Sequence, residues 1–258
     1  MEMPPPLPGE GPPQADSLSG RLLNVFAAPG DVFEDIKGRA PSTANWLAPV
    51  LLGCLMGMVF SLVVFSQDSI LRSIQEMQEQ RIRSQLQKQV DAGKLSREQV
   101  EQAVQLAQRF SGPTVMKVIG CIAAVVMNFG TVFLVGLLIW LVGTKGFKAD
   151  FDYMKAVEAA GLAGMIDALG GLVKMLLAVL TGTVTATPGP VLLVRVFNPA
   201  DRLHLLLSHL NVMSIWYVAV AAMGLAKLSN VSYGRAAAWS FGVWSARVLA
   251  SVLPGWAL

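Results

Sequence analysis

The sequence predicts an all-α polytopic membrane protein that crosses the bilayer with five transmembrane helices. Of its 258 residues, 53% are hydrophobic and only 14% are charged, and the mean hydropathy is +0.54, whereas about a quarter of the residues of soluble domains are charged. The apolar residues are gathered in runs, and about 20 residues of helix cross a hydrocarbon core. We therefore expect one transmembrane domain, residues 46–258, with spans at about 47–66, 118–142, 157–179, 211–228 and 236–253.

The first 45 residues are expected to precede the membrane domain as two segments. Residues 1–16 are an acidic, proline-rich tract that cannot bury a core, so we expect a disordered tail. Because this tract has neither a basic start nor an apolar centre, we expect no signal peptide. Residues 17–45 carry large apolar side chains, too few to cross a bilayer, and are expected to form a cytoplasmic amphipathic segment at the membrane interface. Asp31 is expected to cap a short helix there. Three basic side chains are expected to meet anionic head groups: Arg21, Lys37 and Arg39.

Residues 68–110, between the first two spans, predict an extramembrane helical hairpin. Their composition is Gln, Glu, Arg and Lys with spaced aliphatic residues, which is typical of helices, and Gly93 interrupts it. Just beyond, Ser96 can act as the N-cap of a second helix, with Gln99 as its capping-box partner. We expect packing within the hairpin to account for its apolar residues, and a partner-binding surface is the alternative.

The distribution of Lys and Arg predicts a cytoplasmic N-terminus and an outer C-terminus. The outer loop between the third and fourth spans holds Arg195 and Arg202. Residues 68–110 carry further basic residues and oppose this bias, but acidic residues accompany them. More basic residues flank the expected inner ends of the spans: Arg21, Lys37, Arg39, Lys145, Lys148, Lys155, Lys227 and Arg235.

Four polar or charged residues inside the predicted spans form a candidate intramembrane cluster: Asn128, Asp167, Lys174 and Arg247. A charge at the centre of a membrane helix costs about 2.5 to 3.5 kcal/mol and often marks a transport path. Asp167 and Arg247 are both expected about 15 Å from the inner surface if their spans start at residues 157 and 236. We therefore expect them to form an interhelical tie with Asn128 nearby, while Lys174 extends toward the outer surface. A transport site is the alternative.

Small residues predict where the spans pack closely. Gly53 and Gly57 form a GxxxG motif in the first span, and Gly161 and Gly164 thin the third. Such positions let neighbouring helices approach one another. The four glycines are expected to be helix-packing residues within the chain, and a dimerisation face is the alternative.

Three stretches carry a resemblance to a known family: NVFAAPGDVFEDI, then NWLAP at the first span, then LNVMSIWYVAVAAMGLAKLSNVSYGRAAA from the fourth span into the fifth. Together they resemble the Yip family of five-span integral membrane proteins, over nearly the whole chain after the tail. The resemblance implies a cytoplasmic N-terminus, five helices and an outer C-terminus. The hairpin insertion is similar to bacterial members, which implies the cell inner (cytoplasmic) membrane. The chain departs from the family pattern at Asn211 and Met213, where an acidic residue and a Phe are usual.

The motifs of common enzymes are not found, so we expect no enzyme, no cofactor and no metal site. His204 and His209 are five residues apart, which places them on different helix faces, and HExxH, GxSxG and phosphate-binding glycine loops are missing. We expect a non-enzymatic membrane adaptor or scaffold whose partners are the lipid bilayer and another membrane protein or a second copy, and no nucleic acid. The alternative is a transporter, a channel or a transporter accessory subunit that uses Asp167, Lys174 and Arg247.

Overall fold

The computed structural model describes residues 17–110, 112–198 and 201–253, and these residues form helices and no β-strand. The expected disordered tail, residues 1–16, lies outside the described residues. Four stretches of the described chain are long and apolar enough to cross a membrane: α3 (Thr43–Val64), α6 (Pro113–Leu141) with its π-helical extension η1 (Val142–Gly146), α7 (Tyr153–Thr181) and α9 (Val212–Ser229). The expectation of an all-α membrane protein is confirmed at this level.

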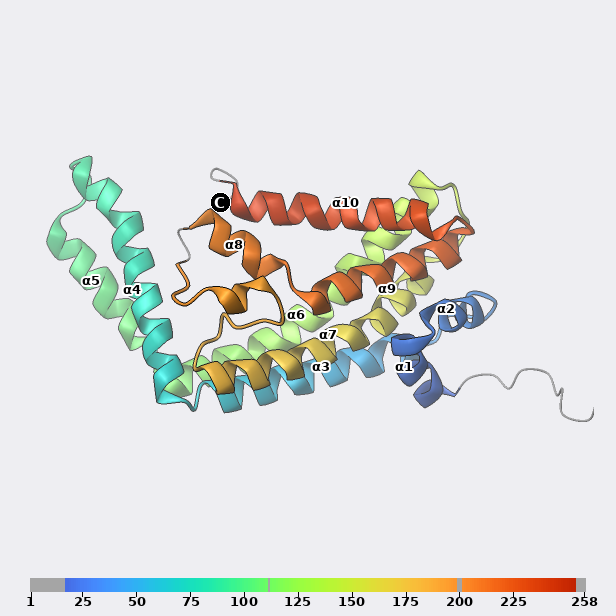
Figure 1. Ribbon diagram of the computed structural model, residues 1–258, viewed down its shortest axis with the longest axis horizontal. Helices are drawn as coiled ribbons and strands as arrows, with labels where there is room; N and C mark the ends of the chain where they lie inside the picture. The colour runs from blue at the N-terminus through green and yellow to red at the C-terminus, as the bar shows by residue number, and fades with distance from the viewer. Residues whose placement is uncertain (1–16, 111, 199–200, 254–258) are drawn as a thin grey trace, which may run out of the picture.

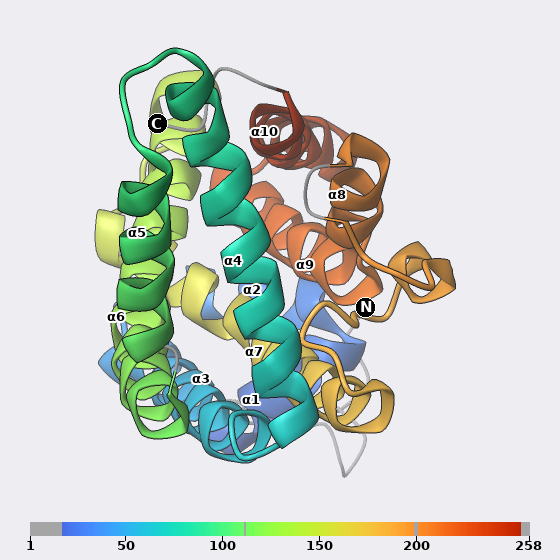
Figure 2. The ribbon, with the colours of Figure 1, turned by 90° about the vertical axis from the view of Figure 1, so that its left-hand side faces the viewer.

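The fifth expected span corresponds to α10 (Tyr233–Val252), which is not among these four. It contains Arg235 and Arg247 among its small and aromatic residues. In Figures 1 and 2 it lies along α9, on the side of α9 that faces away from α3. The count of five spans stays a prediction.

The helices begin earlier than the apolar runs. α3, α6 and α7 start at Thr43, Pro113 and Tyr153, four or five residues before the expected starts at about 47, 118 and 157. Hydropathy detects only the part of a helix that suits hydrocarbon, whereas the helix itself begins at its capping residues. Asp152 is the extended N-cap of α7, and Pro113 occupies the first helical position of α6, where its missing N–H costs nothing.

Helix α7 is the centre of the bundle and lies beside α3, α6 and α9 (Figure 1). Its first half is rich in small residues that are almost fully buried: Ala156, Ala159, Ala160 and Ala163. These small side chains let the neighbouring helices approach closely, which is how membrane helices associate in the absence of a hydrophobic driving force. The helix ends at Gly182, whose φ of 71° is the left-handed conformation that glycine adopts without strain.

Two short helices, α1 (Leu18–Ala27) and α2 (Pro29–Lys37), lie at the end of the bundle where α3 and α7 begin (Figure 1). Val32, Phe33 and Ile36 on α2 are fully buried in the main hydrophobic core. This apolar face therefore packs against α7 and α9 within the protein, and the location of the segment at the membrane interface stays a prediction. The expected cap at Asp31 is wrong, since α2 already begins at Pro29 with Ala28 as its N-cap.

At the opposite end, α4 (Asp68–Asp91) and α5 (Arg97–Arg109) pack on each other and lie across the end of the bundle (Figure 2). The predicted capping box is confirmed, because Ser96 Oγ accepts from the N–H of Gln99 and the Gln99 side chain accepts from the N–H of Ser96. Arg83 Nη1 lies 2.6 Å from Glu101 Oε1 and joins the two helices. The start of α4 is buried against the ends of α3 and α7 through Ile70 and Ile74.

The segment between α7 and α9 contains a 3-10 turn, η2 (Pro190–Leu193), and the short helix α8 (Arg202–His209). Both are too short to cross a membrane. This agrees with the expectation of a loop between the third and fourth spans, and α8 packs against α10.

Candidate functional site: a buried polar network under the N-terminal helices

The first turns of α7 carry an ion pair inside the protein. Lys155 and Glu158 are three residues apart and therefore share one face of the helix, and Lys155 Nζ lies 2.5 Å from Glu158 Oε2. The two residues are only 5% and 1% exposed. A buried ion pair is tolerated only when its geometry is good and further hydrogen bonds satisfy both ions. The other hydrogen-bond partners of Lys155 and Glu158 therefore determine which parts of the protein the pair connects.

Those partners come from two other helices. Asn45 Nδ2, on the first turn of α3, donates to Glu158 Oε1, and Lys155 Nζ donates to the backbone carbonyl of Ile36 at a distance of 2.8 Å. Ile36 lies in the last turn of α2, where the helix dipole favours a positive charge. The pair therefore ties α2, α3 and α7 together at one end of the bundle.

A second set of charges surrounds this network on the N-terminal helices. Asp35 is bridged by Arg21 at 2.8 Å and by Arg39 at 2.5 Å, and Arg21 Nη1 also donates to Asn45 Oδ1 at 3.4 Å. Burial acts to raise the pKa of Asp35, but the hydrogen bonds from Arg39 and Arg21 outweigh it and hold this pKa below its ordinary value. Arg21 and Arg39, expected to meet lipid head groups, are thus paired within the protein.

Helix α2 is also attached to the end of α9. Glu34 lies 3.1 Å from Lys227 and 3.2 Å from Lys37, and the hydrogen bonds from Lys227 and Lys37 lower the pKa of this carboxyl. Lys37 Nζ also donates to Asn230 Oδ1 at 2.5 Å.

Apolar contacts between the same elements complete the attachment. Gly224 of α9 faces Phe33, and a methyl group at position 224 would lie 3.3 Å from the Phe33 ring and from Ala159 of α7. Phe26 packs edge-on against Trp216 of α9, with ring centroids 5.9 Å apart. The N-terminal helices are therefore a fixed part of the folded domain.

This network was not among the expected features. Lys155 was expected only as one of the basic residues that flank the spans, and no role was expected for Glu158. The available signal was their spacing of three residues in the first turns of a predicted membrane helix, which places opposite charges on one face. Asn45, 113 residues away from Glu158 in the chain, could be identified only from the fold.

The residues of the expected intramembrane cluster lie in different surroundings. Asn128 Nδ2 donates to the carbonyl of Ala124 on its own helix at 2.7 Å. Lys174 Nζ lies 5.7 Å above the ring of Phe60 on α3. The Asp167 side chain keeps accessible surface on α7 but is surrounded by protein on most sides, and it lies within electrostatic range of Arg247 on α10 and Tyr217 on α9. Among the described residues no ion pair within 4.0 Å joins them.

The charge of Arg247 also acts on His209, the last residue of α8. His209 Nε2 lies 2.9 Å from Ser251 Oγ on α10, and burial, followed by the positive charge of Arg247, lowers the pKa of His209. The described residues contain no group of three His, Cys, Asp or Glu side chains that could hold a metal ion.

The four glycines that were expected to be helix-packing residues differ in how closely neighbouring helices approach them. A side chain at Gly53 would collide with Asn128 of α6, one at Gly57 would lie 2.6 Å from Ala124, and one at Gly161 would collide with Trp46 of α3. Nothing lies within 4 Å of a methyl group at Gly164.

A comparison with protein-family models gives one match, to the Yip1 domain, over residues 23–253. The chain belongs to the Yip1 domain family. The match starts inside α1 and ends just after α10, so the Yip1 domain of this chain includes the N-terminal helices and the network beneath them. The resemblance recognised from the sequence is confirmed. No curated protein and no solved structure gave a match to the chain.

Proposed function

We propose that this Yip1 domain protein is a non-enzymatic adaptor or scaffold of the cell inner membrane, with a cytoplasmic N-terminus and an outer C-terminus. The observation that carries the proposal is the placement of two helical units at opposite ends of an apolar bundle (Figure 1). The α1–α2 unit lies at one end and the α4–α5 unit at the other. A protein built in this way can hold one surface on each side of a membrane.

The buried network holds the α1–α2 unit, the proposed inner surface, in a fixed position on the bundle. A short terminal segment is normally poorly ordered unless it is tied down, and here Lys155 ties α2 to the bundle through the Ile36 carbonyl. Glu34 and Lys37 add contacts to the end of α9. The α1–α2 unit is thus a rigid surface for a partner, which loses less conformational entropy on binding than a flexible tail does.

The outer surface carries apolar side chains that its own packing leaves free. Val100 and Val104 of α5 face α4 and are 8% and 3% exposed, whereas Leu106 and Phe110 are 57% and 60% exposed. Leu106 and Phe110 are four residues apart and lie on one side of the segment. Another membrane protein, or a second copy of this chain, is the partner that we propose for this face of an extramembrane hairpin.

The dimensions of α10 support five spans. Its 20 residues make a helix of about 30 Å, which matches the thickness of a hydrocarbon core. Five is an odd number of crossings, so five spans place the C-terminus on the side of the membrane opposite the N-terminus. This agrees with the basic residues near the proposed inner ends of the spans.

Co-purification from native membranes tests the adaptor function. A Leu106→Glu variant is expected to lose the same membrane partner, or the second copy, that the wild type retains, by about tenfold. Gln105→Glu is the matched control, because it adds the same charge one residue earlier on another face of α5, and it is expected to retain the partner. Equal recovery with Leu106→Glu would contradict the proposed surface.

The exposed Asp167 favours a second candidate, a transporter, a channel or a transporter accessory subunit. Among the described residues Asp167 has no ion-pair partner within 4.0 Å although it lies in the middle of a predicted span. Intramembrane carboxylates often belong to ion or proton pathways. Flux of a cation through liposomes that contain only the purified protein, abolished in Asp167→Asn, would favour this function over the adaptor.

A further inference from the structure

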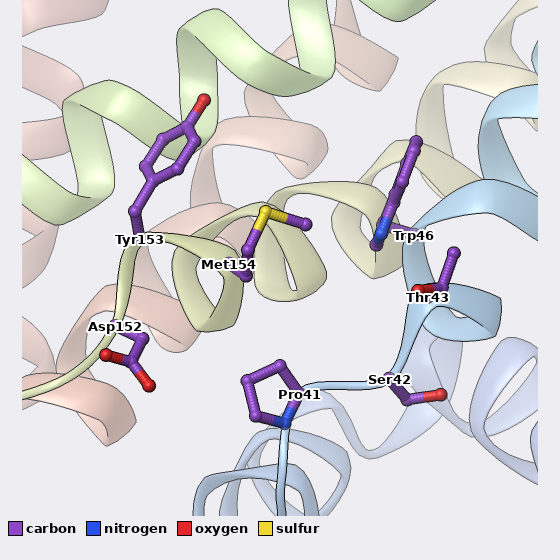
Figure 3. A pocket seen from close by; sticks show the side chains of 7 residues that line it. All are labelled: Pro41, Ser42, Thr43, Trp46, Asp152, Tyr153 and Met154. Atoms are coloured by element: carbon purple, nitrogen blue, oxygen red, sulfur yellow. The ribbon is translucent and has the colours of Figure 1, made fainter.

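A cavity of about 480 Å³ lies between the start of α3 and the start of α7, outside the buried network. Its lining residues come from the two helix starts and the segments that precede them: Pro41, Ser42, Thr43, Trp46, Asp152, Tyr153 and Met154 (Figure 3). The volume is in the range of small-molecule sites, about 300 to 1,000 Å³. Both helices begin here, so the cavity is at the depth where spans meet the head-group region of a bilayer.

Some polar groups at the cavity are left without partners within the described residues, whereas the Tyr153 hydroxyl donates to the carbonyl of Phe133. Trp46 Nε1 is buried and makes no hydrogen bond within the described part of the chain, and Figure 3 shows this nitrogen at the end of the ring nearer the cavity. An indole N–H can only donate, and a buried donor without an acceptor is costly. The ring itself is held by Phe129 and Phe133. The nitrogen has almost no accessible surface, so an acceptor in the cavity would satisfy the Trp46 N–H after a small shift of the ring toward the cavity.

Two further side chains at the cavity do not make the capping hydrogen bond that is usual at their positions. Ser42 and Asp152 are the N-caps of α3 and α7, and neither side chain makes the capping hydrogen bond to its helix. Serine and aspartate at this position normally accept from the second or third N–H of the helix. Asp152 is exposed, and no ion pair within 4.0 Å is found for it among the described residues. The Ser42 hydroxyl and the Asp152 carboxylate are therefore both available to a ligand.

We propose that this cavity binds the head group of a zwitterionic phospholipid that carries a primary ammonium, the phosphoethanolamine type. The phosphate accepts hydrogen bonds from Trp46 Nε1 and from the hydroxyls of Ser42 and Thr43, and the ammonium meets the Asp152 carboxylate. An anionic head group without an ammonium would meet the same donors but would be repelled by Asp152.

The acyl chains of such a lipid would extend from the head-group region along the hydrocarbon core beside the spans. This site does not depend on the adaptor function, because it requires no protein partner.

Lipid selection by the full chain tests the site. The protein is placed in nanodiscs with equal amounts of phosphatidylethanolamine, phosphatidylglycerol and phosphatidylcholine, transferred to a mild detergent, and its bound lipids are counted by native mass spectrometry. Phosphatidylethanolamine is expected to be retained over both others. Equal retention of the three lipids would overturn the proposal.

Two variants separate the two halves of the head group. Trp46→Phe keeps a ring against Phe129 and Phe133 but removes the donor, and it is expected to lower retention of phosphatidylethanolamine about tenfold, as for one hydrogen bond to a charged group. Asp152→Asn is expected to abolish the preference over phosphatidylglycerol. Asp150→Asn and Trp239→Phe, both at exposed positions outside the cavity, are matched controls that should keep the preference.

Folding and the source of the head group are tested in the same preparation. Asp152 makes no capping bond, so Asp152→Asn is expected to melt with the wild type, and a preference that persists in this folded variant would refute the assignment of the ammonium. Glycerophosphoethanolamine, which has the head group without acyl chains, is expected not to displace the lipid at millimolar concentration. Displacement by it would overturn the assignment to a membrane lipid.

Discussion

Replacing Glu158 with Gln separates the buried ion pair from the surface contacts that also hold the N-terminal helices. The substitution keeps the shape of the side chain but leaves the charge of Lys155, 5% exposed, without its counter-ion. Loss of one partner of a buried pair typically costs about 3 to 5 kcal/mol. The Ile36 carbonyl still accepts from Lys155, so we expect the lower end, about 3 kcal/mol, which corresponds to a loss of about 10 °C in melting temperature for a domain of this size.

The matched control is Glu34→Gln on the same N-terminal unit. Its ion pair with Lys227 is exposed, with side chains 52% and 36% accessible, and such pairs contribute about 0 to 1 kcal/mol after screening. We therefore expect its melting temperature to fall by no more than about 2 to 4 °C. The assay is thermal unfolding of the purified protein in one detergent, together with the rate of tryptic cleavage after Lys37 and Arg39. Cleavage should accelerate in Glu158→Gln.

The double variant Lys155→Met with Glu158→Leu distinguishes loss of the pair from loss of shape. Removing both charges together avoids an uncompensated ion, so the double variant is expected to recover most of the stability that Glu158→Gln loses. Equal melting temperatures for Glu158→Gln and Glu34→Gln, or a double variant that is no more stable than Glu158→Gln, would refute the reasoning.

Three further predictions concern the topology, the helix contacts and the response to acid. Cysteines at Gln85 and Gln102 should react with an impermeant reagent from the outer side, and reaction only from the cytoplasmic side would reverse the proposed orientation. Gly161→Ala should lower the melting temperature strongly, since its methyl group would collide with Trp46, whereas Gly164→Ala should not; equal effects would contradict this. The pKa of Asp35 is held below its usual value of 3.8. The ionised carboxylate therefore stabilises the docked N-terminal helices above pH 3.8, and this stabilisation is lost as the pH falls through the lower pKa of the folded state. Asp35→Asn should remove the acid-dependent part of the tryptic cleavage that is measured after acid exposure.

The sequence predicted the spans well because the signal for them is local. A run of about 20 apolar residues indicates a membrane helix whatever it packs against, and four of the five expected runs correspond to candidate spans. The same holds for the capping box at Ser96, whose two hydrogen bonds join residues three positions apart. The starts of α3, α6 and α7 were placed too late because the interfacial turns of a helix are not apolar.

The placement of α1 and α2 could not be predicted from local patterns. An amphipathic helix has the same apolar stripe whether it faces lipid or protein. Here the choice is decided by the shape of the partner, since Gly224 and Ala159 leave room for Phe33. Two of the basic residues assigned to lipid head groups have acidic partners close in the chain, Glu34 for Lys37 and Asp35 for Arg39, at spacings of three and four residues that the sequence already contained. The bridge from Arg21 to Asp35 became evident only once the chain was folded.

The charges inside the spans fall into two classes, and the difference identifies where a functional contact is expected. Glu158 is satisfied by Lys155 and Asn45 and is 1% exposed, so it holds the fold together. Asp167 is exposed in the middle of α7, where a charge without a partner costs free energy in hydrocarbon. A cation from outside the chain would offset that cost. The adaptor function predicts a basic side chain of a partner protein there, and the transporter function predicts a permeating ion.

Asp167→Asn therefore distinguishes the adaptor from the transporter. If a basic residue of a partner helix meets Asp167, the variant should lose co-purification of that partner, and the purified wild-type protein should conduct nothing in liposomes. If a permeating cation meets it, the variant should keep its partners and lose flux. In either case the melting temperature of the isolated protein should stay within about 3 °C of wild type, because Asp167 makes no ion pair within the described chain that the substitution would break. A large loss of stability would instead mean that Asp167 and Arg247 are tied together when the bundle is in a bilayer, which is the pairing that their sequence positions predict.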